Sequence, residues 1–208
     1  MNRLYRILFL IPIIIIGCKT RVMDDKTIIQ SINSLNMNIF SNKGVKLLSI
    51  KSPYSYYEKE KNIFNLKETK INLFKDNESE YIITSNNSKL SNTIKLIELN
   101  GNVVVKTLYK PGDQLYSNSF TWNIENSQFI LVGNVNFINN SITLSSNKAI
   151  LNKTNNIIEF FNPVKYKVND SNNKSGYEVN SQNAYYNINT KSVIFSSKED
   201  RVRSKIYF

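Results

Sequence analysis

One pattern of residues returns along the chain between residues 85 and 164, and it limits the possible folds more than any other feature. Each copy begins at a serine, Ser85, Ser117 or Ser146, and has Leu90, Trp122 or Leu151 five residues later. Apolar residues follow at the twelfth, fourteenth and eighteenth positions: Ile97, Phe129 and Ile158; Leu99, Leu131 and Phe160; Val103, Val135 and Val164. A weaker fourth copy begins at Ser181. Successive starts are 32, 29 and 35 residues apart, so the repeat is degenerate.

Each copy is typical of a strand, a polar turn and a second strand. In the second copy Phe120 and Trp122 alternate with polar residues, and a second apolar run starts at Phe129. The turn formers at the sixteenth position, among them Gly101 and Gly133, are expected at the ends of hairpins. Because a single hairpin cannot bury its apolar face, successive copies must stack. The repeat therefore predicts an all-β fold built of hairpins.

Length and composition fit one folded domain behind a short targeting segment. Apolar residues make up 41% of the 208 residues and aromatic residues 12%, which is too rich for a disordered chain. We expect a signal peptide or anchor over residues 1–17, a tether over 18–36, and one β domain over 37–208. Apolar residues at helical spacing, Ile29, Ile32 and Leu35, predict no more than a turn of helix in the tether. The terminal residues from Arg201 could form a last basic edge strand or a frayed tail, and we expect a tail.

The N-terminus has the layout of a signal peptide. Arg3 and Arg6 precede an apolar run from Ile7 to Ile16, which is too short for a comfortable membrane span. The residues that end at Gly17 and Cys18 resemble a bacterial lipobox, so we expect Cys18 to carry a diacylglycerol and to be the first residue of the mature protein. The alternative is an uncleaved N-terminal anchor. Both predict an exported, membrane-tethered protein.

The charge of the chain favours an anionic partner. The formal net charge is +11, and it is still +9 without Arg3 and Arg6. A membrane surface or a phosphorylated lipid fits better than nucleic acid, because the sequence has no nucleic-acid-binding motif. The alternative is that a skewed genome composition explains the abundance of lysine and asparagine.

The inventory of reactive side chains argues against an enzyme. The chain has no histidine and one cysteine, which excludes histidine-dependent triads and cysteine-based zinc sites. Paired carboxylates lie among polar or charged neighbours at expected turns, so we interpret them as solvated: Glu58 and Glu60, Glu78 and Glu80, Glu199 and Asp200. We expect no catalytic site, no metal site and no cofactor.

The repeat resembles a known family. The segment from Tyr81 to Val103, which returns from Leu115 to Val135, is similar to the OstA-like repeat of lipopolysaccharide transport proteins. With an anchoring N-terminus ahead of one such domain, the chain resembles the LptC family, over roughly Met37 to Val193. The resemblance implies a twisted, V-shaped antiparallel β-jellyroll whose interior holds lipid acyl chains.

The resemblance also implies a function and partners. Proteins of this kind accept lipopolysaccharide from the inner-membrane ABC transporter and pass it to an LptA-like periplasmic partner, which they contact by edge-strand pairing. Such a protein lies at the periplasmic face of the inner membrane. The lipobox departs from the family's uncleaved anchor, which leaves open a lipoprotein variant of an unanchored bridge subunit. The repeat residues that we expect to line the acyl-chain groove are Leu99, Val103, Trp122, Phe129, Leu131, Val135, Ile158 and Phe160.

Two other classes of protein fit parts of the sequence. A structural or adhesive β-rich lipoprotein would have a closed, dry core in place of a groove. A carbohydrate-active β-solenoid enzyme would need buried carboxylates on neighbouring strands, and the apolar faces of the repeat offer none.

Overall fold

A computed structural model describes residues 29–108, 112–126, 128–168, 176–198 and 201–207. The predicted signal peptide, Cys18 and most of the predicted tether lie outside these residues, as does the pair Glu199 and Asp200. None of the described residues forms a helix long and apolar enough to span a bilayer.

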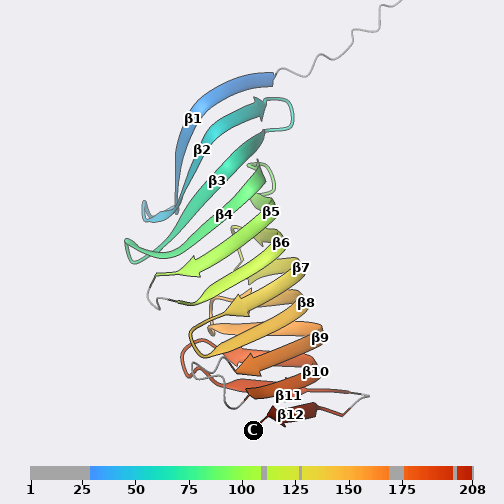
Figure 1. Cartoon of the computed structure of the whole chain (residues 1–208). Coiled ribbons are helices and arrows are strands. Elements are labelled where there is room, and N and C mark those ends of the chain that lie inside the picture. The colour runs from blue at the N-terminus through green and yellow to red at the C-terminus, as the bar shows by residue number, and fades with distance from the viewer. Residues whose placement is uncertain (1–28, 109–111, 127, 169–175, 199–200, 208) are drawn as a thin grey trace, which may run out of the picture.

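Twelve strands form one antiparallel sheet in which each strand from β1 to β11 pairs with the next (Figure 1). The strands are β1 (Ile29–Phe40), β2 (Lys46–Glu58), β3 (Ile63–Lys75), β4 (Glu78–Ser91), β5 (Leu96–Thr107), β6 (Gln114–Asn123), β7 (Gln128–Ile138), β8 (Ile142–Asn152), β9 (Ile157–Val168), β10 (Gly176–Asn187), β11 (Val193–Ser196) and β12 (Arg203–Tyr207). The short strands β11 and β12 both pair with β10, β11 near its end and β12 near its start. The predicted all-β antiparallel fold is confirmed.

Each predicted repeat is one hairpin of this sheet. The four copies correspond to β4–β5, β6–β7, β8–β9 and β10–β11. The structure adds an earlier copy in β2–β3 that begins at Ser52, with Tyr57, Phe64 and Leu66 at the fifth, twelfth and fourteenth positions. Tyr57 pairs with Phe64 and their rings stack at 4.5 Å.

The repeated serine marks a bend in its strand. The pairing register shifts beside Ser85, Ser117 and Ser146. The extra residue of the β-bulge lies on the following strand, where residues 101–103, 133–135 and 162–164 face 85–86, 117–118 and 146–147. Each serine is buried, and its Oγ donates a hydrogen bond to the carbonyl oxygen two residues later, at 3.2, 2.9 and 2.9 Å respectively. The same bond forms at Ser52 and Ser181. The hydroxyl thus satisfies a carbonyl near the disrupted ladder.

The bend keeps one face of the serine strand buried on both sides. In β4 the buried residues are Tyr81, Ile83 and Ser85 before the bend, and Ser88 and Leu90 after it. The step from Ser85 to Ser88 shifts the inward alternation by one position, so both halves of the strand face the same core.

The prediction that Gly101 and Gly133 lie at hairpin ends is wrong. Both lie inside strands, β5 and β7, with φ of +78° and +79°. A Cβ on Gly133 would lie 2.8 Å from Nδ2 and 3.1 Å from Cβ of Asn118 on the facing strand β6. Glycine is needed there because of the left-handed backbone in the bulge and because the Asn118 side chain leaves no space.

The predicted boundary at residue 37 is also corrected. Strand β1 begins at Ile29, eight residues earlier, so much of the expected tether belongs to the sheet. Leu35, Met37 and Ile39 alternate inward and pack on the core, and the pairing of β1 with β2 overrides the helical spacing. At the other end, the expected frayed tail contains β12.

The turns form two rows, and the folded sheet brings these rows together. Row A contains the turns that follow even-numbered strands, and row B those that follow odd-numbered strands (Figure 1). Tyr81 at the row B end of β4 contacts Phe129 at the row A end of β7, with ring centroids 6.2 Å apart. Phe137 at the row B end of β7 contacts Tyr186 at the row A end of β10, at 4.6 Å. The rows therefore meet with an offset of three strands along a line that we call the seam.

An added Cβ at Gly133 should destabilise the protein by more than the left-handed backbone alone would, because it also collides with Asn118. Gly133→Ala should lower the free energy of unfolding by about 3 kcal/mol. Part of this loss comes from placing alanine in a left-handed conformation, and the rest from the steric clash of its Cβ with Asn118. Gly44→Ala is the control, because Gly44 has φ +77° with nothing within 4 Å of the added Cβ, and it should cost about 1 kcal/mol. If urea unfolding showed the same loss of stability for both variants, the Asn118 side chain would move aside at no cost and the prediction would be wrong.

The Tyr186 hydroxyl predicts a pH dependence of stability. Burial raises the pKa of this hydroxyl from 10.0 to about 12, so the folded chain keeps the proton that the unfolded chain releases. The free energy of unfolding should therefore fall as the pH rises from about 10 to about 12. Tyr186→Phe should lose about 1 kcal/mol at neutral pH, because Asn139 Nδ2 no longer donates to the hydroxyl, and should show a smaller decline in that window. Identical slopes for the two proteins in thermal melts would contradict the assignment.

Candidate functional site

The structure brings all eight predicted groove residues together in one core. Each is at most 5% exposed, and all belong to a single apolar cluster that runs through the folded sheet. Phe129 lies near its centre, with the rings of Phe120 and Trp122 each 5.2 Å away and the ring of Tyr81 reaching it across the seam. Whether these residues touch acyl chains stays a prediction.

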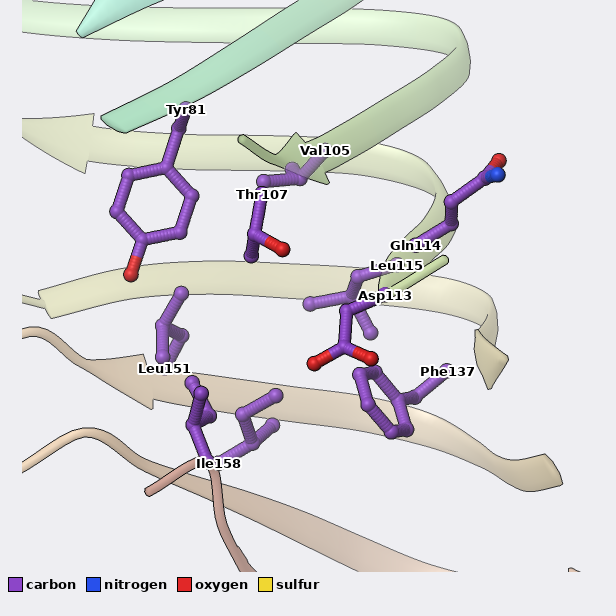
Figure 2. Close-up of a pocket in the computed structure, with 10 residues that line it drawn as sticks. Tyr81, Val105, Thr107, Asp113, Gln114, Leu115, Phe137, Leu151 and Ile158 are labelled. Carbon is purple, nitrogen blue, oxygen red and sulfur yellow. The ribbon is translucent and has the colours of Figure 1, made fainter. Parts of the chain in front are cut away.

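The interior between β4 and β10 is filled by side chains. A cavity of about 20 Å³ lies at the seam, enough for about one water molecule. Figure 2 shows Tyr81 and Thr107 on one side of it and Leu151 and Ile158 on the other. Burial raises the pKa of Tyr81, so its hydroxyl is neutral at physiological pH. This part of the core is packed, as the scaffold alternative also expects.

The offset of the rows leaves one row without a partner at each end of the sheet. Leu35, Met37, Ile39 and Phe64 near the β1 end pack against the core but stay only partly buried, and so do Tyr166, Val193 and Phe195 near the other end. The apolar interior is therefore least covered at its two ends.

The far end of the core is covered by an aromatic group. The ring of Tyr166 on β9 lies 6.0 Å from that of Tyr177 on β10 and 5.3 Å from that of Phe195 on β11. The two short strands β11 and β12 share the edge beyond β10. Apolar side chains thus continue to this end of the sheet.

The two edges of the sheet also differ. Strand β1 is twelve residues long, contains no charged residue and pairs only with β2. The opposite edge consists of strands of four and five residues, and β12 contains Arg203 and Lys205. Short strands and basic side chains hinder the addition of another strand, whereas a long uncharged edge favours it. The β1 edge is the one better suited to pair with another protein.

The carboxylates expected at solvated turns lie at strand ends where the structure describes them: Glu58 is the last residue of β2, and Glu78 and Glu80 lie at the start of β4. The Glu58 side chain is only 16% exposed. Lys61 Nζ lies 2.8 Å from its Oε2, and this hydrogen bond together with that from Asn65 lowers the pKa of Glu58. Across the described ranges, no group of three or more potential ligands could hold a metal ion.

The sequence pattern missed two polar residues that contact the core. Lys153 in the turn between β8 and β9 lies over the rings of Trp122 and Phe129 on the neighbouring hairpin of row A. Asn139 in the turn between β7 and β8 bonds to Tyr186 across the seam at 3.3 Å. Neither belongs to the apolar stripe, so the repeat gives no signal for them.

Comparison with known proteins places the chain in a family. No curated protein matches the sequence. Among solved structures, that of LptH from Pseudomonas aeruginosa, the LptA-homologous periplasmic component of its lipopolysaccharide transport device, is similar to 62% of this chain and 94% of that chain, with 12% identity and a TM-score of 0.49. A family model for OstA-like proteins matches residues 113–205. The model described as "Lipopolysaccharide-assembly, LptC-related" matches residues 16–130, more than half of the chain. The chain belongs to this LptC-related family of lipopolysaccharide-assembly proteins.

Proposed function

We propose that this protein is an LptC-like conduit that accepts lipopolysaccharide from the inner-membrane ABC transporter and passes it to an LptA-like periplasmic partner. The observation that carries the proposal is one apolar stripe, buried on successive hairpins of a folded sheet, in a chain of the LptC-related family. The chain's role is binding and transfer, and it involves no chemical step.

The position of the N-terminus gives the conduit a direction. Ten residues separate Cys18 from Ile29 at the start of β1. At about 3.5 Å per extended residue this segment spans at most about 40 Å, so the β1 end of a chain lipidated at Cys18 stays near the membrane. The β1 end of the apolar core would then be the end that faces the transporter. An uncleaved anchor would place the sheet in the same orientation.

The edges supply the contacts to neighbouring proteins. The uncharged β1 edge would pair with a strand of the transporter, through backbone hydrogen bonds of the kind that already join β1 to β2. The edge formed by β11 and β12 would then face the LptA-like partner. Acyl chains in the core would add about 0.8 kcal/mol of binding free energy per buried methylene.

A photo-crosslinking amino acid at Leu131 tests the lining directly. Leu131 is fully buried, whereas the next residue, Val132, is 46% exposed on the outer face and serves as the matched control. In cells we expect a lipopolysaccharide adduct from position 131 and none, or much less, from position 132. If every position of the stripe gave only protein-internal adducts, the lining would be wrong and the dry-core alternative would stand.

Depletion of the protein separates transport from scaffolding. The packed core between β4 and β10 keeps a structural or adhesive lipoprotein as the second candidate. If the chain is a conduit, its depletion should make newly made lipopolysaccharide accumulate in the inner membrane, as measured by fractionation after pulse labelling. A scaffold would leave lipopolysaccharide traffic unchanged.

A further inference from the structure

Lys153 places a positive charge at the boundary between the core and solvent. It lies in the turn between β8 and β9, in row A, and is half-buried. Its Nζ is 5.7 Å from the ring centroid of Trp122 and 5.5 Å from that of Phe129, two of the predicted lining residues. Phe129 in turn contacts Tyr81 from row B, so the ammonium group lies beside the seam.

This cation is incompletely neutralised. Glu80 and Lys75 of row B are close enough to act on it electrostatically, Glu80 favouring and Lys75 opposing its charge. Within the described part of the chain, the ion pairs shorter than 4 Å join other residues. Loss of water around the ammonium is the main reason that the pKa of Lys153 is lowered. Two cations and one carboxylate thus leave the seam electropositive at this point.

The fold itself gains little from such a group. A half-buried ammonium without a close counter-ion is unfavourable compared with an aliphatic side chain, and the ring faces offset only part of that loss. An anion bound at Nζ would supply the missing counter-charge. A phosphate suits the site, since lysine binds phosphate as a point charge and needs no bidentate geometry.

We propose that Lys153 forms a head-group subsite for the phosphate of an acylated, phosphorylated lipid whose acyl chains lie along Trp122, Phe129 and Leu131. The subsite deepens the proposed function and rests on it. The chains would enter the core at the seam, and the phosphate would stay outside next to the ammonium. Glu80 would then limit how tightly the phosphate is held, which suits a protein that must pass its lipid on.

Binding assays on the full chain in dodecyl maltoside test the subsite with three probes. These are diphosphorylated hexa-acyl lipid A, the same lipid without its phosphates, and inorganic phosphate. For Lys153→Met we expect about tenfold weaker binding of the phosphorylated lipid and unchanged binding of the dephosphorylated one. Lys153→Arg should stay within about twofold of the wild type, since it keeps the charge. Inorganic phosphate should not displace the lipid, because it brings no acyl chains.

Lys148→Met is the matched control. Lys148 also lies over an aromatic ring, 5.4 Å from the centroid of Phe161, but it is exposed. This variant should bind both lipids as the wild type does. The melting temperature of Lys153→Met should equal or exceed that of the wild type, because a half-buried charge has been removed.

The outcomes separate the subsite from the proposed function. An equal loss for both lipids, or no loss, in Lys153→Met would overturn the subsite and leave the conduit intact. Displacement by inorganic phosphate at the lipid's own concentration would show a free-anion site and would overturn the head-group assignment. If the wild type bound neither lipid, both the conduit and the subsite would fall.

Discussion

The structure depends on each long strand being able to bend at one point without losing its hydrogen bonds. A straight strand of this length would present one apolar face over its whole span, and nothing in a single sheet could cover it. At the bend the inward alternation shifts by one position, so both halves of the strand face the core, and the Ser85, Ser117 and Ser146 hydroxyls satisfy a carbonyl beside the disturbed ladder. The left-handed glycine in the following strand belongs to the bulge that accommodates this shift. The sequence repeat therefore mainly encodes the bend that recurs in successive hairpins.

Folding the sheet on itself creates the seam, and the offset of the seam decides where the core is covered. Because row B meets row A three strands further along, the middle of the sheet is covered on both sides and its core is dense. At each end of the sheet one row lacks such a partner, and Leu35, Met37 and Phe195 there stay only partly buried. One geometric fact thus explains both the packed centre and the less covered ends.

The sequence predicted what the local alternation determines and failed where pairing between strands decides. The alternation of Phe120 and Trp122 fixes a strand, and the returning stripe fixes which face is buried. Gly133 was misplaced because a glycine at a turn and a glycine in a bulge look the same in one dimension. Strand β1 was missed because Ile29, Ile32 and Leu35 also fit a helix, and only pairing with β2 decides between them. The contacts of Lys153 form only after its hairpin has paired with the one that carries Trp122 and Phe129.

A packed core is compatible with a lipid conduit if the seam is the weakest line in the structure. Neighbouring strands are joined by continuous ladders of backbone hydrogen bonds, whereas the contacts across the seam are made by side chains, such as Phe137 with Tyr186 and Asn139 with Tyr186. Separating the rows therefore exposes apolar side chains but breaks no ladder. An entering chain of a dozen methylenes recovers about 10 kcal/mol by covering such surface. The lipid can thus replace the opposite row as the cover of the core, while the bends at the bulges keep the sheet intact.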